Sequence, residues 1–300
     1  MRDEQIGGAA GKPGDMITPD ITRVLMDSLA QRWRKYLKEL RRCKRAFSEE
    51  SVHDLRVATR RLISILMIVE IVKPDSRSRW LQRRLKRLFD AFGPLRDTQV
   101  QILTIEKKVT EFPELATLLT MLRVRERSQM NTVAVKIMKI ETRPLSRIIS
   151  AIKKSLRVHF SRPMMQRIGM NAVFGAAASK YLTAVAYKEH VVPTRARTIH
   201  RARIAFKKLR YTLEALLPML SSANKEYVRA LDAYQTRMGE IQDAELLSTL
   251  VRNFAARRSL ASRRRLSGFR RQIALTKKEL TAAYVQSAED LYSFWKPSSQ

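Results

Sequence analysis

Apolar residues recur every three to four positions along almost the whole chain, with charged residues between them. This spacing predicts amphipathic α-helices, because it places one apolar stripe on a helix that turns every 3.6 residues. We therefore predict helices, and only helices, over two successive sets of segments. The predicted helices cover residues 19–46, 49–73, 76–92, 94–110, 112–141, 145–158, 165–189, 196–221, 224–238, 240–257 and 260–295.

The predicted helix boundaries follow the prolines, including the Gly93-Pro94 pair. Pro218 falls late in its segment and should end or kink that helix, because proline lacks the backbone N–H that the helix requires. With only 9 Gly and 10 Pro in 300 residues, and with segments rich in Ala, Leu, Arg, Lys and Glu, the composition is that of an all-α protein.

A sequence motif appears twice, about half a chain apart. Both copies read His-x2-Arg-x3-basic-basic-Leu, and they begin at His53 and His200. Each is followed, at nearly the same distance, by Gly-x-x-x-Asp, which ends at Asp97 and Asp243. Such a pairing indicates a tandem duplication of one helical unit. We place the repeats at about 19–150 and 160–295, with the boundary near 142–165, and expect residues 1–18 to be a loose tail.

Projected as helices, the two motif segments carry a basic edge opposite an apolar edge. In the first copy, Arg56 and Arg60 fall close to His53 around the helix, and Arg61 lies on the other side of that histidine. In the second copy, Arg203, Lys207 and Arg210 share the face of His200. Basic helix faces are usually solvated, but acidic residues are nearly absent from these two edges, and the same register recurs in both halves. The pattern therefore favours an anion-binding function.

The net charge strengthens this interpretation. The chain has 59 Lys+Arg against 28 Asp+Glu, a formal net charge of +31, which produces a long-range field that attracts polyanions. Its 45% hydrophobic residues are enough for a substantial core.

The repeated motifs resemble those of the CHAD family, the conserved histidine α-helical domain. The resemblance covers about residues 19–295, in what looks like the stand-alone form of the family. It implies two antiparallel helical bundles, related by a pseudo-twofold axis, that face each other across a central basic cleft or pore. It also implies that the ligand is inorganic polyphosphate and that the protein associates with polyphosphate granules. The residues implied to bind polyphosphate are His53, Arg56, Arg60, Arg61, Arg96, His200, Arg203, Lys207, Lys208 and Arg210.

The two halves differ within the resemblance, since Gln242 stands where the first copy has Arg96. Three roles are open for His53 and His200: a protonated phosphate ligand, a neutral donor that orients an arginine, or a helix cap. We predict that Asp97 and Asp243 act as helix N-terminal acids or pair with arginines. Further basic clusters could extend the path of the ligand. We therefore add Arg123, Arg127, Arg257 and Arg264 to the predicted polyphosphate-binding residues.

Three rival functions remain open. A nucleic-acid binder fits the charge, but only Tyr211 interleaves an aromatic ring with the basic edges, and base stacking needs more; weak nucleic-acid binding is expected from charge alone. An enzyme acting on polyphosphate would need a magnesium-binding carboxylate cluster, and we expect neither enzymatic activity nor a cofactor nor a metal site. A scaffold that binds other proteins at the granule surface is compatible with polyphosphate binding.

The sequence also bears on location. No segment approaches the roughly 18 apolar residues of a membrane span, and the single cysteine, Cys43, allows no internal disulfide. We therefore expect a cytoplasmic protein located at polyphosphate granules.

Overall fold

A computed structural model describes residues 20–219 and 225–295. Over these residues the protein is all-α, with no strand, as predicted. The expected tail, residues 1–18, lies outside the described residues. The helices are α1 (Ile21–Arg45), α2 (Glu49–Val72), α3 (Ser76–Glu106), α4 (Leu115–Met138), α5 (Thr142–His159), α6 (Pro163–Glu189), α7 (Ala196–Leu216), α8 (Lys225–Ala256) and α9 (Leu260–Gln286), with short 3₁₀ helices η1 (Leu217–Met219) and η2 (Ala288–Ser293).

Local sequence sets several of the helix ends. Asp20 caps α1 by accepting the backbone N–H of Thr22 at 2.9 Å, and Ser48 and Ser51 form a reciprocal capping box at the start of α2. The α-helical part of α7 ends just before Pro218, where η1 takes over. The effect predicted for that proline is thus confirmed.

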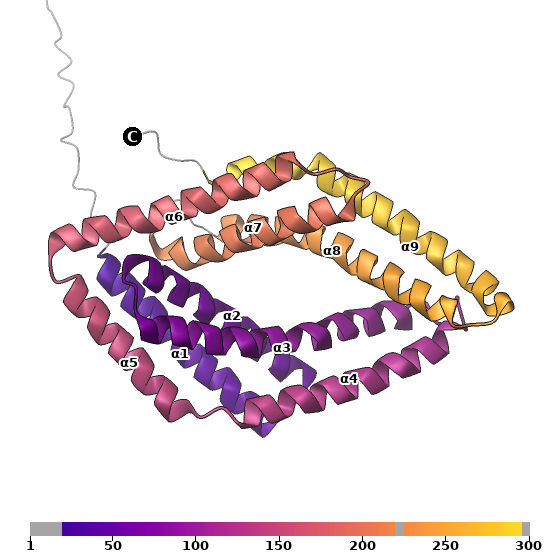
Figure 1. Ribbon diagram of the computed structural model, residues 1–300, viewed down its shortest axis with the longest axis horizontal. Helices are drawn as coiled ribbons and strands as arrows, with labels where there is room; N and C mark the ends of the chain where they lie inside the picture. The colour runs from indigo at the N-terminus through magenta and orange to yellow at the C-terminus, as the bar shows by residue number, and fades with distance from the viewer. Residues whose placement is uncertain (1–19, 220–224, 296–300) are drawn as a thin grey trace, which may run out of the picture.

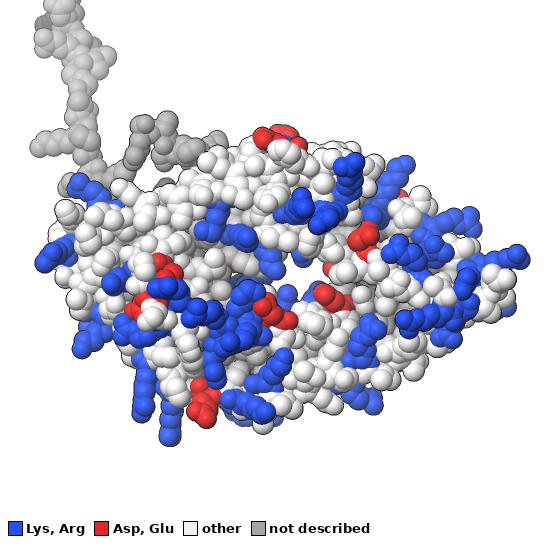
Figure 2. Space-filling view, in the orientation of Figure 1, with Lys and Arg blue, Asp and Glu red and all other residues white. Residues whose placement is uncertain are grey.

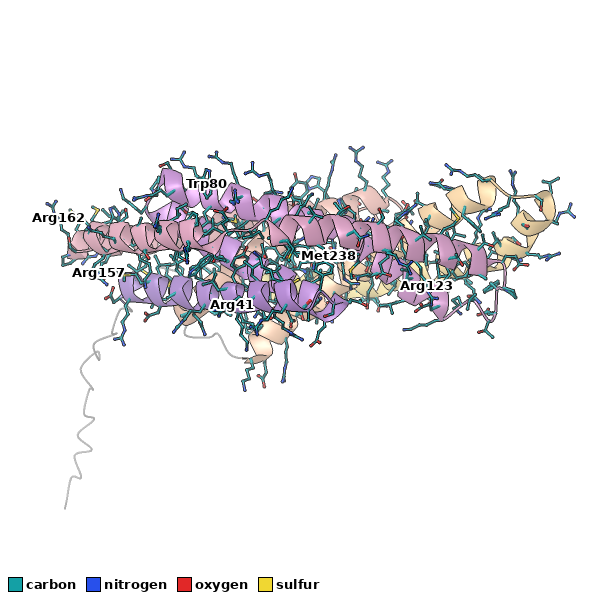
Figure 3. All side chains as sticks on the ribbon, turned by 90° about the horizontal axis from the view of Figure 1, so that it is seen from below. Arg41, Trp80, Arg123, Arg157, Arg162 and Met238 are labelled. Carbon is teal, nitrogen blue, oxygen red and sulfur yellow. The ribbon has the colours of Figure 1, made fainter. Side chains whose placement is uncertain are left out.

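The two copies of each repeated motif lie on different helices in the two halves of the chain. The first motif lies on α2 and the second on α7, and the Gly-x-x-x-Asp elements lie on α3 and α8. In Figure 1, α4, α5, α6 and α9 form the outline of the molecule, and α1, α2, α3, α7 and α8 lie inside it. Seen from the side, the molecule is long and flat (Figure 3). This arrangement is consistent with two facing bundles, and it brings both motif helices to the middle.

Three apolar cores hold this arrangement together. The first is built from α1, α2, α3 up to Leu95, the end of α4, α5, the first half of α6, and the end of α7 with η1. The second lies among α7, the start of α8 and the ends of α6 and α9. The third joins the α3–α4 hairpin to the α8–α9 hairpin, with Ile105 and Leu118 on one side and Val251 and Leu266 on the other. The halves are therefore packed together at the far end from α5, which limits how far they can separate.

The helix predicted over 260–295 is too long, since α9 ends at Gln286 and η2 follows it. Two predicted breaks between helices are also wrong. Helix α3 runs through Gly93 and Pro94 without a break, because Phe92 and Leu95 are each only 1% exposed and pack into the first core on both sides of the proline. Helix α8 likewise continues through Gly239. Burying two large apolar side chains contributes several kcal/mol, against about 1 kcal/mol for an interior glycine and about 3 kcal/mol for an interior proline. Tertiary packing therefore overrides the local preference.

Gly169 in α6 packs closely against the ring of Phe160, and substitution of this glycine tests the packing. A Cβ added there would lie 2.7 Å from Cε1 of Phe160, whose ring is buried, and 3.4 Å from Ile21. We expect Gly169→Ala to lower the free energy of unfolding by about 1–2 kcal/mol through overpacking. In the same helix, Gly175 has no atom within 4 Å of such a Cβ, so Gly175→Ala should raise that free energy by about 0.5–1 kcal/mol. Denaturant unfolding of both variants checks the pair, and equal effects would contradict the packing argument.

Candidate functional site

The basic edges of α2 and α7 meet between the two halves. Four cations converge there, Arg56 and Arg60 from α2 and Arg203 and Lys207 from α7, and we refer to them as the central cluster. The charge of Lys207 is close enough to all three arginines to be affected by them. Figure 2 shows the surface hollowed between α7 and α8 on one side and α2 and α3 on the other, with both Lys/Arg and Asp/Glu side chains near the rim. Tertiary structure thus joins two motifs that are half a chain apart.

Two aromatic rings support the cluster. The guanidinium carbon of Arg60 lies 4.9 Å from the ring centroid of Tyr211, and that of Arg56 lies 5.1 Å from the centroid of Phe89. The ammonium of Lys207 lies 5.7 Å from Tyr211 and 5.8 Å from Phe89. Each such contact contributes about 0.5–1 kcal/mol or somewhat more when desolvated. The rings hold the cations in place without cancelling their charge.

The central cluster lacks carboxylate partners. Among the described residues, no Asp or Glu oxygen lies within 4.0 Å of a cationic nitrogen of these four side chains, whereas sixteen such ion pairs form elsewhere. The Nε atoms of Arg56, Arg60 and Arg203 are buried and have no hydrogen-bond partner. Buried donors are nearly always satisfied in folded proteins. Unsatisfied cationic donors gathered in one hollow are what a site for an anion requires.

Burial and mutual repulsion shift the protonation of the cluster. Burial, followed by the charges of Arg203, Arg56 and Arg60, lowers the pKa of Lys207 from its ordinary value to about 8. The pKa of Arg56 is also lowered, mainly by burial and then by Arg60 and Arg96. An anion bound here would offset that repulsion and raise both values again. The cluster is therefore electrostatically prepared for a negative ligand.

Asp97 and Asp243 do not begin helices, so that predicted role is wrong. Both lie inside long helices, α3 and α8, because the expected breaks at Gly93 and Gly239 are absent. Neither forms an ion pair with an arginine within the described part of the chain, although both feel the charge of Arg203. Desolvation raises the pKa of each carboxyl, and the nearby cations oppose that rise. The two aspartates thus mark an acidic edge beside the cluster.

The two motif histidines have different surroundings. His53 is exposed and lines a pocket of about 490 Å³ together with Arg56 and Arg96. His200 is half-buried, and its Nδ1 donates to the side-chain oxygen of Gln242 at 2.6 Å. Neither histidine caps its helix, since Ser48 caps α2 and His200 lies beyond the first turn of α7. The Arg96/Gln242 difference therefore places a guanidinium near His53 in one half and a hydrogen-bonded amide beside His200 in the other. Glu49 and Glu50 also line the pocket of His53.

The model of the CHAD domain family matches residues 25–252, about three quarters of the chain. The chain belongs to the CHAD family. This confirms the resemblance that the paired motifs indicated.

Solved CHAD structures share the fold. The CHAD domain from the plant Ricinus communis superposes with a TM-score of 0.59 at 18% identity, covering 91% of this chain and 89% of that one. PptA from Streptomyces chartreusis gives a TM-score of 0.59 at 15% identity, covering 91% and 99%. At these identities the likeness establishes the fold alone. No curated protein matches the sequence significantly.

Three residues of the CHAD motifs lie apart from the central cluster. Arg61 and Arg210 line a second pocket, of about 520 Å³. Lys208 is exposed, and its charge contributes to lowering the pKa of Lys180 on α6, which is lowered mainly by burial. Lys180 lay outside the repeated motifs, and no sequence signal singled it out.

The outer arginines of the CHAD chain are not gathered at the central cluster. Arg123 forms an ion pair with Glu106 at 2.7 Å. Arg127, on α4, is exposed, as are Arg257, at the end of α8, and Arg264, on α9. Their contact with a long ligand remains a prediction. Phe89 is the contributor to the cluster that the sequence analysis missed, because it stands outside both motifs and resembles an ordinary apolar position of α3.

Arg210 supports a prediction about stability. Its Nε lies 2.7 Å from Glu214 and its Nη1 2.6 Å from Asp232, and its side chain is buried. Arg210→Met would leave the mostly buried Glu214 carboxylate without its partner, and we expect the free energy of unfolding to fall by about 2–4 kcal/mol. The exposed neighbour provides a control, since Lys208→Met should change it by less than about 0.5 kcal/mol. Thermal and denaturant unfolding check both; an Arg210→Met variant as stable as the control would contradict the assignment.

Two further findings concern this CHAD chain as a whole. No helix in the described ranges is long and apolar enough to cross a membrane. Nor do residues 20–219 and 225–295 contain three or more His, Cys, Asp or Glu side chains grouped so that they could hold a metal ion.

Proposed function

We propose that this CHAD protein binds inorganic polyphosphate through the central cluster. The observation that carries the proposal is the convergence of Arg56, Arg60, Arg203 and Lys207 from both halves without carboxylate partners. A site of this kind attracts a ligand that brings many negative charges into one hollow. Arginine suits phosphate because its planar fork donates two parallel hydrogen bonds and stays charged when partly desolvated.

Polyphosphate matches the shape of the site as well as its charge. It is a flexible chain with about one negative charge per internal phosphate and no side groups to be recognised. A row of cations that continues from α2 to α7 therefore serves better than a closed pocket. Binding would release condensed counterions, so the affinity should fall steeply as salt rises.

Nucleic acid is the alternative ligand that the net charge of +31 favours. Single-stranded nucleic acid is usually bound by free aromatic faces on which bases stack. In the central cluster, however, Phe89 and Tyr211 each have cations over their rings. This arrangement favours a ligand made of phosphate alone.

A competition experiment tests the proposal. Fluorescent long-chain polyphosphate is bound to the purified protein at physiological salt and then challenged with unlabelled polyphosphate, duplex DNA or RNA. We expect displacement by polyphosphate at concentrations at which the nucleic acids, matched per phosphate, displace little. Equal displacement per phosphate would show that general positive charge accounts for binding, and the nucleic-acid alternative would replace the proposal.

The same proposal extends to location and to the absence of catalysis. A polyphosphate binder would gather on polyphosphate granules in the cytoplasm, where its exposed basic helices could also contact granule-surface proteins. Binding alone should leave the chain length of the ligand unchanged, which gel electrophoresis of polyphosphate after long incubation with the protein would check. Shortening of the chains would contradict the expectation that the protein is not an enzyme.

A further inference from the structure

A second pocket lies where α1, α2, α7, η1 and the start of α8 meet. Its volume is about 520 Å³, within the range of pockets that bind small molecules. None of the four residues of the central cluster lines it. We call it the outer pocket, and the charged side chains that define it are Arg32, Lys35, Arg61, Arg210, Glu214, Arg229 and Asp232. Of these, Lys35 forms an ion pair with Glu39 outside the pocket.

Three arginines of the outer pocket have unused hydrogen-bonding capacity. Arg32 donates through Nη2 to the backbone oxygen of Glu214 at 3.1 Å, but its Nη1 is buried without a partner. Arg61 and Arg229 are exposed and form no ion pair with any described residue. By contrast, Arg210 is held by two carboxylates. The pocket therefore has a fixed internal ion-pair network and a set of free guanidinium donors around it.

The acidic and apolar residues that line the outer pocket indicate which class of ligand it would bind. Glu214 and Asp232 each pair with Arg210 through one carboxylate oxygen, so the pocket also offers carboxylate oxygens to hydrogen-bond donors of a ligand. Carboxylate oxygens accept hydrogen bonds from hydroxyl and amino groups. Ala58, Leu217 and Val228 add apolar surface. Inorganic polyphosphate has neither donors of that kind nor an apolar body, whereas a small phosphorylated organic molecule has both.

We propose that the outer pocket is a separate binding site for a small phosphorylated organic anion of the nucleotide type. The phosphate groups contact Arg32, Arg61 and Arg229, and the hydroxyl or amino groups of the organic part donate to Glu214 and Asp232. The proposal does not rest on polyphosphate binding at the central cluster, because the two sites share no lining residue.

Isothermal titration of the full-length protein with ATP and with inorganic tripolyphosphate tests this site. Arg61→Gln/Arg229→Gln removes two exposed donors of the outer pocket, and Arg56→Gln/Arg203→Gln removes the same charge from the central cluster. We expect saturable ATP binding that weakens about tenfold or more in the first double variant, since one charged hydrogen bond is worth about that factor. The second double variant should keep saturable ATP binding, because the outer pocket is intact in it. In that same variant, tripolyphosphate should bind more weakly than ATP.

The alternative outcomes overturn the inference in distinct ways. Absence of saturable ATP binding would remove the site. ATP binding that is lost in Arg56→Gln/Arg203→Gln but kept in Arg61→Gln/Arg229→Gln would show that small anions use the central cluster. Tripolyphosphate binding as tight as that of ATP in Arg56→Gln/Arg203→Gln, where the central cluster is weakened, would show that the organic part is not recognised. Long-chain polyphosphate binding is measured in parallel, so that failure at one site is distinguished from failure at the other.

Discussion

Replacing Arg56 and Arg203 together with glutamate is expected to weaken the binding of long-chain polyphosphate by about a hundredfold or more. The two arginines come from different halves, and each presents a buried Nε without a partner to the hollow. Reversing both charges removes two donors and places carboxylates against the ligand. It supplies counterions to Arg60 and Lys207, but it also removes the cations that offset the desolvated carboxyls of Asp97 and Asp243. The melting temperature of the variant is therefore measured alongside its affinity.

A matched control separates the site from the overall charge. Arg157 and Arg162 lie at one end of the molecule (Figure 3), and both are exposed. Arg157→Glu/Arg162→Glu changes the net charge by the same amount and should alter affinity only a few-fold. Fluorescence titration of all three proteins at physiological salt, with circular dichroism to check folding, gives the comparison. Equal losses in the two double variants would contradict a dedicated cluster.

The second large effect is a dependence of polyphosphate binding on pH. We expect it near the pKa of the Lys207 ammonium. Its pKa in the free protein is about 8, because of burial and of the charges of Arg203, Arg56 and Arg60, opposed by Asp90 and Asp97. The bound polyanion favours the charged form and raises that pKa. Above pH 8 binding must therefore include proton uptake by Lys207. Affinity should fall about tenfold between pH 7 and pH 9, where about a tenth of free Lys207 is protonated.

The effect on the stability of the free protein has the opposite sign. The folded-state pKa of Lys207 lies below that of an unfolded lysine, so the unfolded chain binds more protons between about pH 8 and pH 10.5. Lys207 therefore destabilises the folded protein less as the pH rises through that window, and the free energy of unfolding increases. Below pH 8 the ammonium is charged in both states and its burial costs the most.

Lys207→Arg provides the test, because arginine stays charged throughout this range. In that variant the affinity should vary little between pH 7 and pH 9, while the unmodified protein loses about tenfold. Isothermal titration in two buffers of different ionisation enthalpy would also detect the proton taken up. An unmodified protein that binds equally at both pH values would contradict the coupling.

The helical fold could largely be predicted from periodicity. Segments with strong apolar stripes, such as 49–73, match the observed helices within a few residues, as α2 (Glu49–Val72) shows. The failures are local signals that packing overrides. Gly93-Pro94 and Gly239 are helix breakers in isolation, yet the buried neighbours Phe92 and Ile241 keep α3 and α8 continuous.

The sequence predicted which cationic residues belong to the candidate site. It did not predict which of them lie close together. The repeated register identified Arg56 and Arg203 as equivalent positions, and it could not distinguish them from Arg210. All three look like cations on a basic edge. Arg210 pairs with Glu214, four residues later on the same helix, and with Asp232, which comes from another helix. Only the contact between helices decides which guanidinium groups are neutralised.

The sequence alone determined the all-α fold, the repeated motif and the excess of positive charge, because each of these follows from composition and from spacing along the chain. The tertiary structure alone decided which cations meet, which of them lack carboxylates, and which aromatic rings hold them. Phe89 and Tyr211 illustrate the difference, since they share the ammonium of Lys207 although they are far apart in sequence. The physical reason is that electrostatic energy depends on distance and burial in space, and these are set by how the two halves pack.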